Sequence, residues 1–225
     1  MRPKRNIAVE NAIVEELAKA FPGDAIMAEE GYATTSIPDG RIWIIDPICG
    51  TNNLGRGLSS FCTNIALADG GELIASCVVD HAKGDYFWSV GDGVHVNDSP
   101  LDPHALDDRP DVCIDVDLGA LMKSDVPAKD RHCRAVRTLV DMPGYVCISL
   151  NSSLGFAYMA IGKIDGLLNA CNHPWDVAAG AFLIQQAGGI ITDTEGNPWS
   201  LASNGVIGAR TAGIHQALVD SYAAQ

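Results

Sequence analysis

The chain opens with apolar residues at helical spacing. They stand three or four positions apart: Val9, Ile13, Leu17 and Ala20. This spacing gathers them on one face of a helix, and Pro22-Gly23 ends the pattern. The pattern predicts an amphipathic helix over residues 7–20 that packs against a sheet.

Runs of strand length follow this helix. AIMAEE (25–30) and RIWIID (41–46) are short apolar runs that each end in acidic residues. From Thr63 onward, TNIALA, LIASCVVD, YFWSV and VHVN are separated by the turn sequences DGGE, HAKGD and GDG. Strands joined by short turns at such regular intervals are typical of an antiparallel meander.

The second half of the chain mixes the two periods. Strands are expected near residues 112–117 and 145–149, and helices near 129–141, 152–162, 176–187 and 211–223. GLLNA, GGIITD and GVIGA are short apolar strands bounded by glycine. The whole predicts an α/β protein of layered helices and sheets, with one domain over residues 1–225 and residues 105–110 (ALDDRP) as the only candidate subdivision.

Composition narrows the class of ligand. The 225 residues are 47% hydrophobic, enough for a substantial core, and carry a formal net charge of −13. A nucleic-acid surface needs clustered lysine and arginine, so a nucleic-acid polymer is not an expected partner. An anionic ligand would have to be held by backbone amides or by bound cations.

Cysteine usage and hydropathy indicate the compartment. The seven cysteines are odd in number, lie mostly in apolar stretches and form no CxxC pair, so they are interpreted as small buried side chains in a reducing compartment. No apolar run approaches the roughly 18 residues of a membrane span, and no signal peptide is evident. We therefore expect a cytoplasmic protein with no membrane partner.

Three acidic positions are candidates for chemistry. Glu29 and Asp46 each follow an apolar strand, and Asp176 opens the helical pattern PWDVAAGAFLIQQ. Taken singly, they also fit a solvated strand end, an aspartate that starts a turn before proline, and a helix cap, respectively. Brought together with a backbone carbonyl of the DPI turn, they would suit Mg²⁺, which takes oxygen ligands.

GTNNL, directly after Cys49, predicts an anion site. Gly50 permits a tight turn, and Thr51 and Asn52 are good residues for starting a helix. The free amides at such a start bind a phosphate without any basic side chain. Beside a metal cluster, this arrangement would serve hydrolysis of a phosphomonoester by a metal-activated water.

These segments together resemble a known family. WIIDPICGTNN resembles the WxxDPxDGTxN motif of the inositol monophosphatase family, MAEEG its upstream acidic pair, and HPWDVAAGAFLIQQAGG its WDxAAGxxLxxEAGG signature. GDGVHVNDSPL is also similar to the family's GxGAxxNGxxL, and the motifs occur in the family's order. The resemblance covers nearly the whole chain from about residue 6.

The resemblance implies a fold, an activity and roles for individual residues. The fold is an α/β/α/β sandwich, here lacking the first helix, and the activity is Mg²⁺-dependent, or Mn²⁺-dependent, hydrolysis of an inositol, sugar or nucleotide phosphate, commonly by a homodimer. Glu29 and the Ile48 carbonyl would hold the first metal, Asp176 and position 49 the second, and Asp46 would bridge the two. Thr51 would orient water with Glu29, and the Gly50 and Thr51 amides would take phosphate beside Asp176.

The chain departs from the family pattern at several of these places. Cys49 replaces an aspartate that ligates the second metal, and Asn6 stands where the family has an acid before the helix. Leu150-Asn151 replaces a Gly-Ser pair, and Asn169 replaces an acid that reads the substrate.

Three hypotheses follow from these departures. The first is a phosphatase with an altered second metal site. The second is a weak or inactive homologue that binds a phosphorylated small molecule or serves as a structural subunit. The third is a site that uses the Cys49 thiolate to recruit a transition metal such as Zn²⁺.

Overall fold

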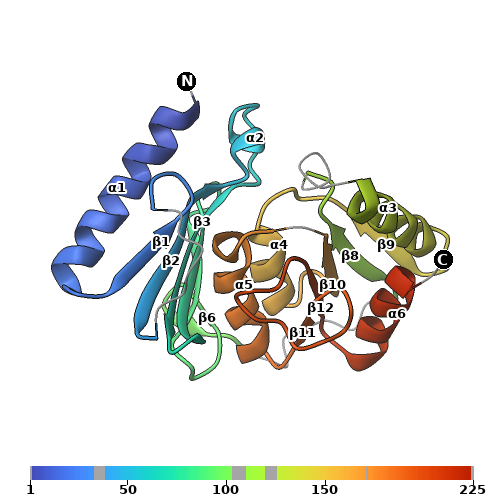
Figure 1. The fold of residues 1–225 in the computed structure, drawn as a ribbon. Helices are drawn as coiled ribbons and strands as arrows, with labels where there is room; N and C mark the ends of the chain where they lie inside the picture. The colour runs from blue at the N-terminus through green and yellow to red at the C-terminus, as the bar shows by residue number, and fades with distance from the viewer. Residues whose placement is uncertain (1, 33–38, 103–109, 120–125, 171, 224–225) are drawn as a thin grey trace.

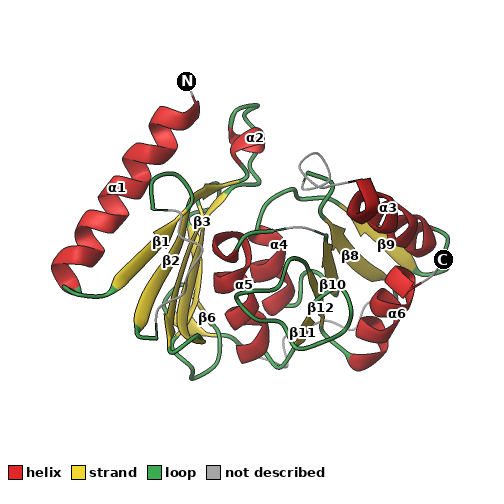
Figure 2. Cartoon of the chain, in the orientation of Figure 1, coloured by secondary structure: helices red, strands yellow, loops and turns green. Residues whose placement is uncertain are grey.

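The computed structural model describes residues 2–32, 39–102, 110–119, 126–170 and 172–223. Within these ranges it has two β-sheets and six helices, shown in Figures 1 and 2. The candidate subdivision at 105–110 falls mainly on residues outside the described ranges.

The first sheet has seven strands in sequence order. They are β1 (Ala25–Ala28), β2 (Arg41–Cys49), β3 (Cys62–Asp69), β4 (Glu72–Asp80), β5 (Asp85–Ser89), β6 (His95–Val96) and β7 (Ser99–Pro100). β1 pairs with β2 in parallel, and every later pair is antiparallel. The predicted meander is confirmed.

The second sheet has five strands in the order β11-β12-β10-β8-β9. Their bounds are β8 (Val112–Val116), β9 (Tyr145–Ile148), β10 (Gly166–Asn169), β11 (Ile190–Thr192) and β12 (Val206–Ala209). β8 runs parallel to both β9 and β10, whereas β12 is antiparallel to its neighbours. The carboxyl ends of β8 and β10 therefore lie at one edge of this sheet.

Helices separate and cover the two sheets, as Figure 1 shows. α4 (Leu154–Ala160) and α5 (Pro174–Gln186) lie between the sheets, α1 (Arg2–Ala20) covers the outer face of the first sheet, and α3 (Val126–Val140) and α6 (Ala212–Ala223) cover the second. α5 is buried at every position from Val177 to Ile184, because a helix between two sheets has no face left for water. The predicted layered α/β sandwich is confirmed.

The first helix begins earlier than its apolar pattern indicates. It starts at Arg2 rather than near residue 7. The added residues include Pro3, which is tolerated in a first turn because no N–H is needed there. Val14 of this helix packs against Ala28 and Ile45, so the predicted apolar stripe does face the sheet.

The interpretation of the cysteines as mostly buried is wrong. Among the six that the structure describes, all free thiols, only Cys62 is fully buried and Cys133 is exposed. Cys171 lies outside the described residues. In the described ranges, no helix combines the length and the apolar character that a membrane span requires.

Candidate active site

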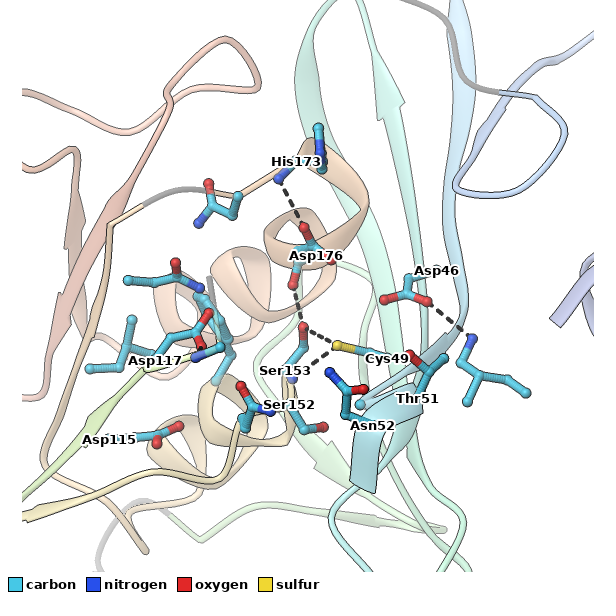
Figure 3. Close-up of a pocket in the computed structure, with 18 of the residues that line it drawn as sticks. Asp46, Cys49, Thr51, Asn52, Asp115, Asp117, Ser152, Ser153, His173 and Asp176 are labelled. Atoms are coloured by element: carbon cyan, nitrogen blue, oxygen red, sulfur yellow. Dashed lines mark hydrogen bonds between the residues drawn. The ribbon is translucent and has the colours of Figure 1, made fainter. Parts of the chain in front are cut away.

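One cavity of about 330 Å³ lies where the two sheets and α5 converge. Figure 3 shows residues from β2, α2, the start of α4, the end of β8 and the start of α5 around it. Every site residue predicted from the sequence lines this cavity: Glu29, Asp46, Ile48, Cys49, Gly50, Thr51 and Asp176. The fold therefore brings together three segments that lie far apart along the chain.

Asp46 does not end its strand, contrary to the sequence-based expectation. β2 continues through Pro47 to Cys49, with an irregularity in its register against β3 between Asp46 and Cys49. β1 pairs only with residues 42–45, so no strand in the described part of the chain pairs with β2 on that side at Pro47, and a proline is tolerated at such a position. The irregularity leaves the Asp46 carboxylate in the cavity, where its Oδ1 accepts a hydrogen bond from the Ile48 amide at 3.0 Å.

The cluster of acids around Asp46 needs a positive charge. Asp46 is 1% exposed. Burial is the main reason that its pKa is raised well above the usual range, and the nearby Cys49, Glu29 and Asp176 groups raise it further. A divalent cation would remove this mutual repulsion, so the three carboxylates fit a hard metal ion such as Mg²⁺.

Asp176 both caps its helix and faces this cluster. It lies in the first turn of α5, where its Oδ2 accepts a hydrogen bond from the His173 amide at 2.9 Å. One ligand atom each from Asp46, Cys49 and Asp176 lie within 4.8 Å of one another. Asp176 can therefore serve both as a helix cap and as a metal ligand, two roles that the sequence left as alternatives.

Cys49 is held by the start of α4. Its Sγ lies 3.2 Å from the amide nitrogen of Ser153, which donates to it, and 3.0 Å from the hydroxyl oxygen of Ser153. That hydroxyl donates to the Asp176 carbonyl at 2.6 Å, which leaves the cysteine S–H to donate to the serine oxygen. The adjacent Cys62 thiol, together with burial, raises the pKa of the Cys49 thiol well above its usual range, so Cys49 is neutral at pH 7 and fits Mg²⁺ poorly.

Gly50, and not Thr51, caps the short helix α2 (Thr51–Leu54). Its carbonyl accepts the amides of Asn53 and Leu54, and its φ of 85° is left-handed. A Cβ at this position would lie 2.7 Å from the Ser60 carbonyl oxygen, so only glycine fits the turn. The turn brings Gly50, Thr51 and Asn52 to the wall of the cavity.

The loop that carries Glu29 is supported by α1. The carboxylate of Glu10 accepts the amides of Glu30 at 2.8 Å and Gly31 at 2.7 Å. The sequence analysis placed Asn6 before this helix, but Asn6 lies within it. Its Nδ2 donates a hydrogen bond to the Glu30 carboxylate at 2.9 Å. The side-chain amide of Asn6 therefore helps to position the loop that carries Glu29 and Glu30.

The sequence analysis missed part of the cavity wall. Asp115 lies near the end of β8 and Asp117 directly after it, and Ser152 and Ser153 precede α4. An aspartate at the end of an apolar strand was the signal that selected Asp46, and the same signal was present in VCIDVD (112–117). Asn151 and Asn169, predicted only as departures from the family, also line the cavity.

Comparison with known proteins agrees with this geometry. The model of the inositol monophosphatase family matches residues 5–224. The chain is 31% identical over 214 residues to Nus factor SuhB of Pseudomonas aeruginosa, covering 91% of this chain and 76% of that protein. It is 30% identical over 199 residues to inositol-1-monophosphatase of Rhizobium meliloti, with coverages of 88% and 74%.

Solved structures share the fold. An IMPase of Thermotoga maritima superposes with a TM-score of 0.80 at 28% identity, covering 95% of this chain and 80% of that one. SaIMPase-II with bound inositol monophosphate gives a TM-score of 0.83 at 22% identity, with coverages of 98% and 84%. The chain belongs to the inositol monophosphatase family.

Proposed function

We propose that this protein is a Mg²⁺-dependent or Mn²⁺-dependent phosphomonoesterase of the inositol monophosphatase type, with a second metal site altered by Cys49. The observation that carries the proposal is the convergence of Glu29, Asp46 and Asp176 on one cavity beside the Gly50 turn. Family membership supports the metal dependence and the reaction class.

The ligands divide into two sets. Glu29, Asp46 and the Ile48 carbonyl would hold one metal ion, and Asp46, Asp176 and position 49 would hold a second. Bound metal would supply positive charge to the phosphoryl oxygens and lower the pKa of an attacking water.

The protein groups then orient the reactants. Glu29 would accept the proton of the attacking water, and the Thr51 hydroxyl would orient that water toward phosphorus. The amides of Gly50 and Thr51 would bind phosphoryl oxygens, in a protein whose net charge is −13. The neutral thiol of Cys49 would weaken the second site for Mg²⁺ without removing the first.

Phosphate release tests this proposal directly. We expect release from small phosphomonoesters at millimolar Mn²⁺ or Mg²⁺ and none with chelator. Glu29→Gln should abolish release, whereas Asp69→Asn, which changes an exposed acid at the end of β3, should leave it intact. No release from a panel of inositol, sugar and nucleotide monophosphates would contradict the proposal.

A binding protein without turnover is the second candidate. Cys49 and Asn6 both replace acids of the family pattern, and several relatives carry the name Nus factor, which is a name for their role and not for hydrolysis. This candidate predicts that inositol monophosphate binds without release of phosphate. Release by the wild-type protein at the rate of a Cys49→Asp variant would argue against it.

A softer metal ion is the third candidate. The Cys49 sulfur lies within 4.8 Å of ligand oxygens from Asp46 and Asp176, and a thiolate prefers Zn²⁺ to Mg²⁺. Metal analysis of protein purified without added metal separates this candidate from the first. Zinc or iron at one equivalent would support it, and their absence would remove it.

A further inference from the structure

The wall of the cavity away from the metal ligands is also acidic. Figure 3 shows Asp115 and Asp117 on one side of the cavity and Asp46 and Cys49 on the other, with Asp176 and Ser153 between them. Both acids come from the end of β8. The metal cluster and this wall face one ligand space from opposite sides.

Asp115 uses only half of its hydrogen-bonding capacity within the described residues. The residue is 8% exposed, and its Oδ1 accepts the amide of Leu150 at 2.9 Å. Its Oδ2 lies against Gly155, where an added Cβ would approach it to 2.0 Å. Among the residues that the structure describes, no hydrogen bond reaches Oδ2, although the oxygen belongs to a residue that lines the cavity.

Asp165, a buried acid that does not line the cavity, shows how such a carboxylate is otherwise paired in this chain. It is also 8% exposed, but its Oδ2 accepts the Cys113 amide at 2.8 Å and its Oδ1 pairs with Arg210 at 3.0 Å. Within the described ranges, no lysine or arginine pairs with Asp115 in the way that Arg210 pairs with Asp165. Unpaired buried carboxylates are expensive and collect at functional sites, so the half-used Asp115 points to a ligand.

The charge of the cavity indicates which ligand. Five carboxylates line it: Glu29, Asp46, Asp115, Asp117 and Asp176. No lysine or arginine is among the described lining residues, and His173 is the one basic side chain there. Metal ions would neutralise the cluster of Asp46, Cys49 and Asp176, whose ligand atoms lie within 4.8 Å of one another, and Asp115 and Asp117 are not part of that cluster.

We propose that Asp115, with Asp117, binds a protonated amine of the substrate, so that the ligand is the phosphomonoester of an amino sugar or amino polyol. This proposal rests on the proposed phosphatase function, which places the phosphate of the ligand beside the metal ligands. The ammonium group would then lie at the opposite wall. An ammonium group offers three donors and a full positive charge, whereas a hydroxyl group would bring no positive charge to the buried Asp115 carboxylate. Burial raises the pKa of Asp115 to about 7, and a bound cation would return the carboxylate to its charged form.

Matched pairs of esters test the proposal. Phosphate release at pH 7 with Mn²⁺ is measured for glucosamine 6-phosphate against glucose 6-phosphate and for glucosamine 1-phosphate against glucose 1-phosphate. N-acetylglucosamine 6-phosphate serves as the uncharged analogue. We expect kcat/KM to favour the amine of at least one pair by about tenfold, the ratio that one charged hydrogen bond supplies.

Two variants assign the preference. Asp115→Asn keeps an oxygen for the Leu150 amide and removes the charge, so it should bring the ratio close to one, and Asp117→Asn should lower it in part. Asp69→Asn should leave the ratio unchanged. Equal rates for both members of each pair, or a preference that survives in Asp115→Asn, would overturn the proposal.

Binding separates this proposal from the proposed function. Calorimetry with Mn²⁺ present gives the dissociation constants of glucosamine 6-phosphate and glucose 6-phosphate. The wild-type protein is used if it hydrolyses neither ester, and the Glu29→Gln variant is used if it does. Tighter binding of the amine ester, lost in Asp115→Asn, would support the amine site even if hydrolysis were absent. Equal binding of the two esters would overturn it even if hydrolysis were present.

Discussion

The Sγ atom of Cys49 lies 3.0 Å from the Oγ atom of Ser153 and 3.2 Å from its amide nitrogen. The hydroxyl of Ser153 in turn donates to the carbonyl of Asp176, at the start of α5. This chain of contacts joins β2, α4 and α5 at the second metal position. The thiol is therefore held by the same polar groups that could orient a carboxylate.

A Cys49→Asp variant should bind Mg²⁺ at least about tenfold more tightly than the wild type, because a hard oxygen ligand replaces a neutral thiol. Phosphate release should rise in parallel. With chelator present, the variant should unfold at a lower temperature, because a further carboxylate joins Asp46 and Asp176. Calorimetric metal titration and thermal unfolding measure these effects. Cys49→Ser is the control, and a gain in that variant as large as in Cys49→Asp would refute the explanation.

Asp115→Asn should change how stability depends on pH in the metal-free and ligand-free protein. Burial raises the pKa of Asp115 to about 7, above the usual 3.8 of an unfolded chain. The folded state therefore disfavours the charged form of Asp115. The resulting loss of unfolding free energy is absent below about pH 4, grows toward about pH 7 and stays constant above that pH. At pH 8 the variant should be more stable, with a ceiling of about 4 kcal/mol from the pKa difference.

Denaturant unfolding of both proteins from pH 4 to pH 8 measures this difference. Comparing the two proteins cancels the titration of other acids such as Asp46. A difference in unfolding free energy that stays constant over the range would show that Asp115 has an ordinary pKa. Asp69→Asn supplies the matched control at an exposed position.

Asn53 should be required for the contact between α2 and the segment before α4. The side chain is buried, and its Nδ2 donates to the carbonyls of Ser60 and Leu150, each at 2.8 Å. Asn53→Ala should lower the free energy of unfolding by about 1–3 kcal/mol because both acceptors lose a donor. Asn53→Asp should lower it further, since a carboxylate would face two carbonyl oxygens.

Denaturant unfolding measures both variants. Asn11→Ala, an exposed change on α1, should alter stability by less than about 0.5 kcal/mol. A loss in Asn53→Ala no larger than in this control would mean that the two hydrogen bonds contribute nothing.

Glu10 should influence metal binding although it lies outside the cavity lining. Its carboxylate is 1% exposed and accepts the amides of Glu30 and Gly31, directly after the proposed ligand Glu29. Glu10→Ala should lower stability by about 2–4 kcal/mol, because two amides lose a charged acceptor. Metal affinity should fall as the loop loses its support, and Glu10→Gln, which keeps one acceptor oxygen, should lie between.

Metal titration and unfolding of the same samples check this coupling. Glu15→Gln, an exposed change on the same helix, is the control and should affect neither quantity. Unchanged metal affinity in a folded Glu10→Ala protein would show that the Glu29 loop is positioned without α1.

Local patterns were sufficient for most of the fold. The meander from β3 to β6 and the helices α3 to α6 follow from periodicity and turn residues, because each is decided by neighbours along the chain. The ends of elements were less accurate. β2 passes through Pro47, where none of the described strands pairs with it on the β1 side. The local sequence does not contain this information about neighbouring strands.

The sequence alone also selected three acidic residues of the cavity, since three ordered motifs contain Glu29, Asp46 and Asp176. Only the tertiary structure decided what surrounds them. It placed the Ser153 hydroxyl against Cys49, Glu10 beneath the Glu29 loop, and Asp115 against Gly155 across the cavity. The hydrogen-bonded partners among them lie between 20 and 104 positions apart along the chain, so no local sequence pattern relates them. Motifs record residues of similar chemistry, whereas the opposite wall of a cavity depends on how two sheets and the helices between them pack.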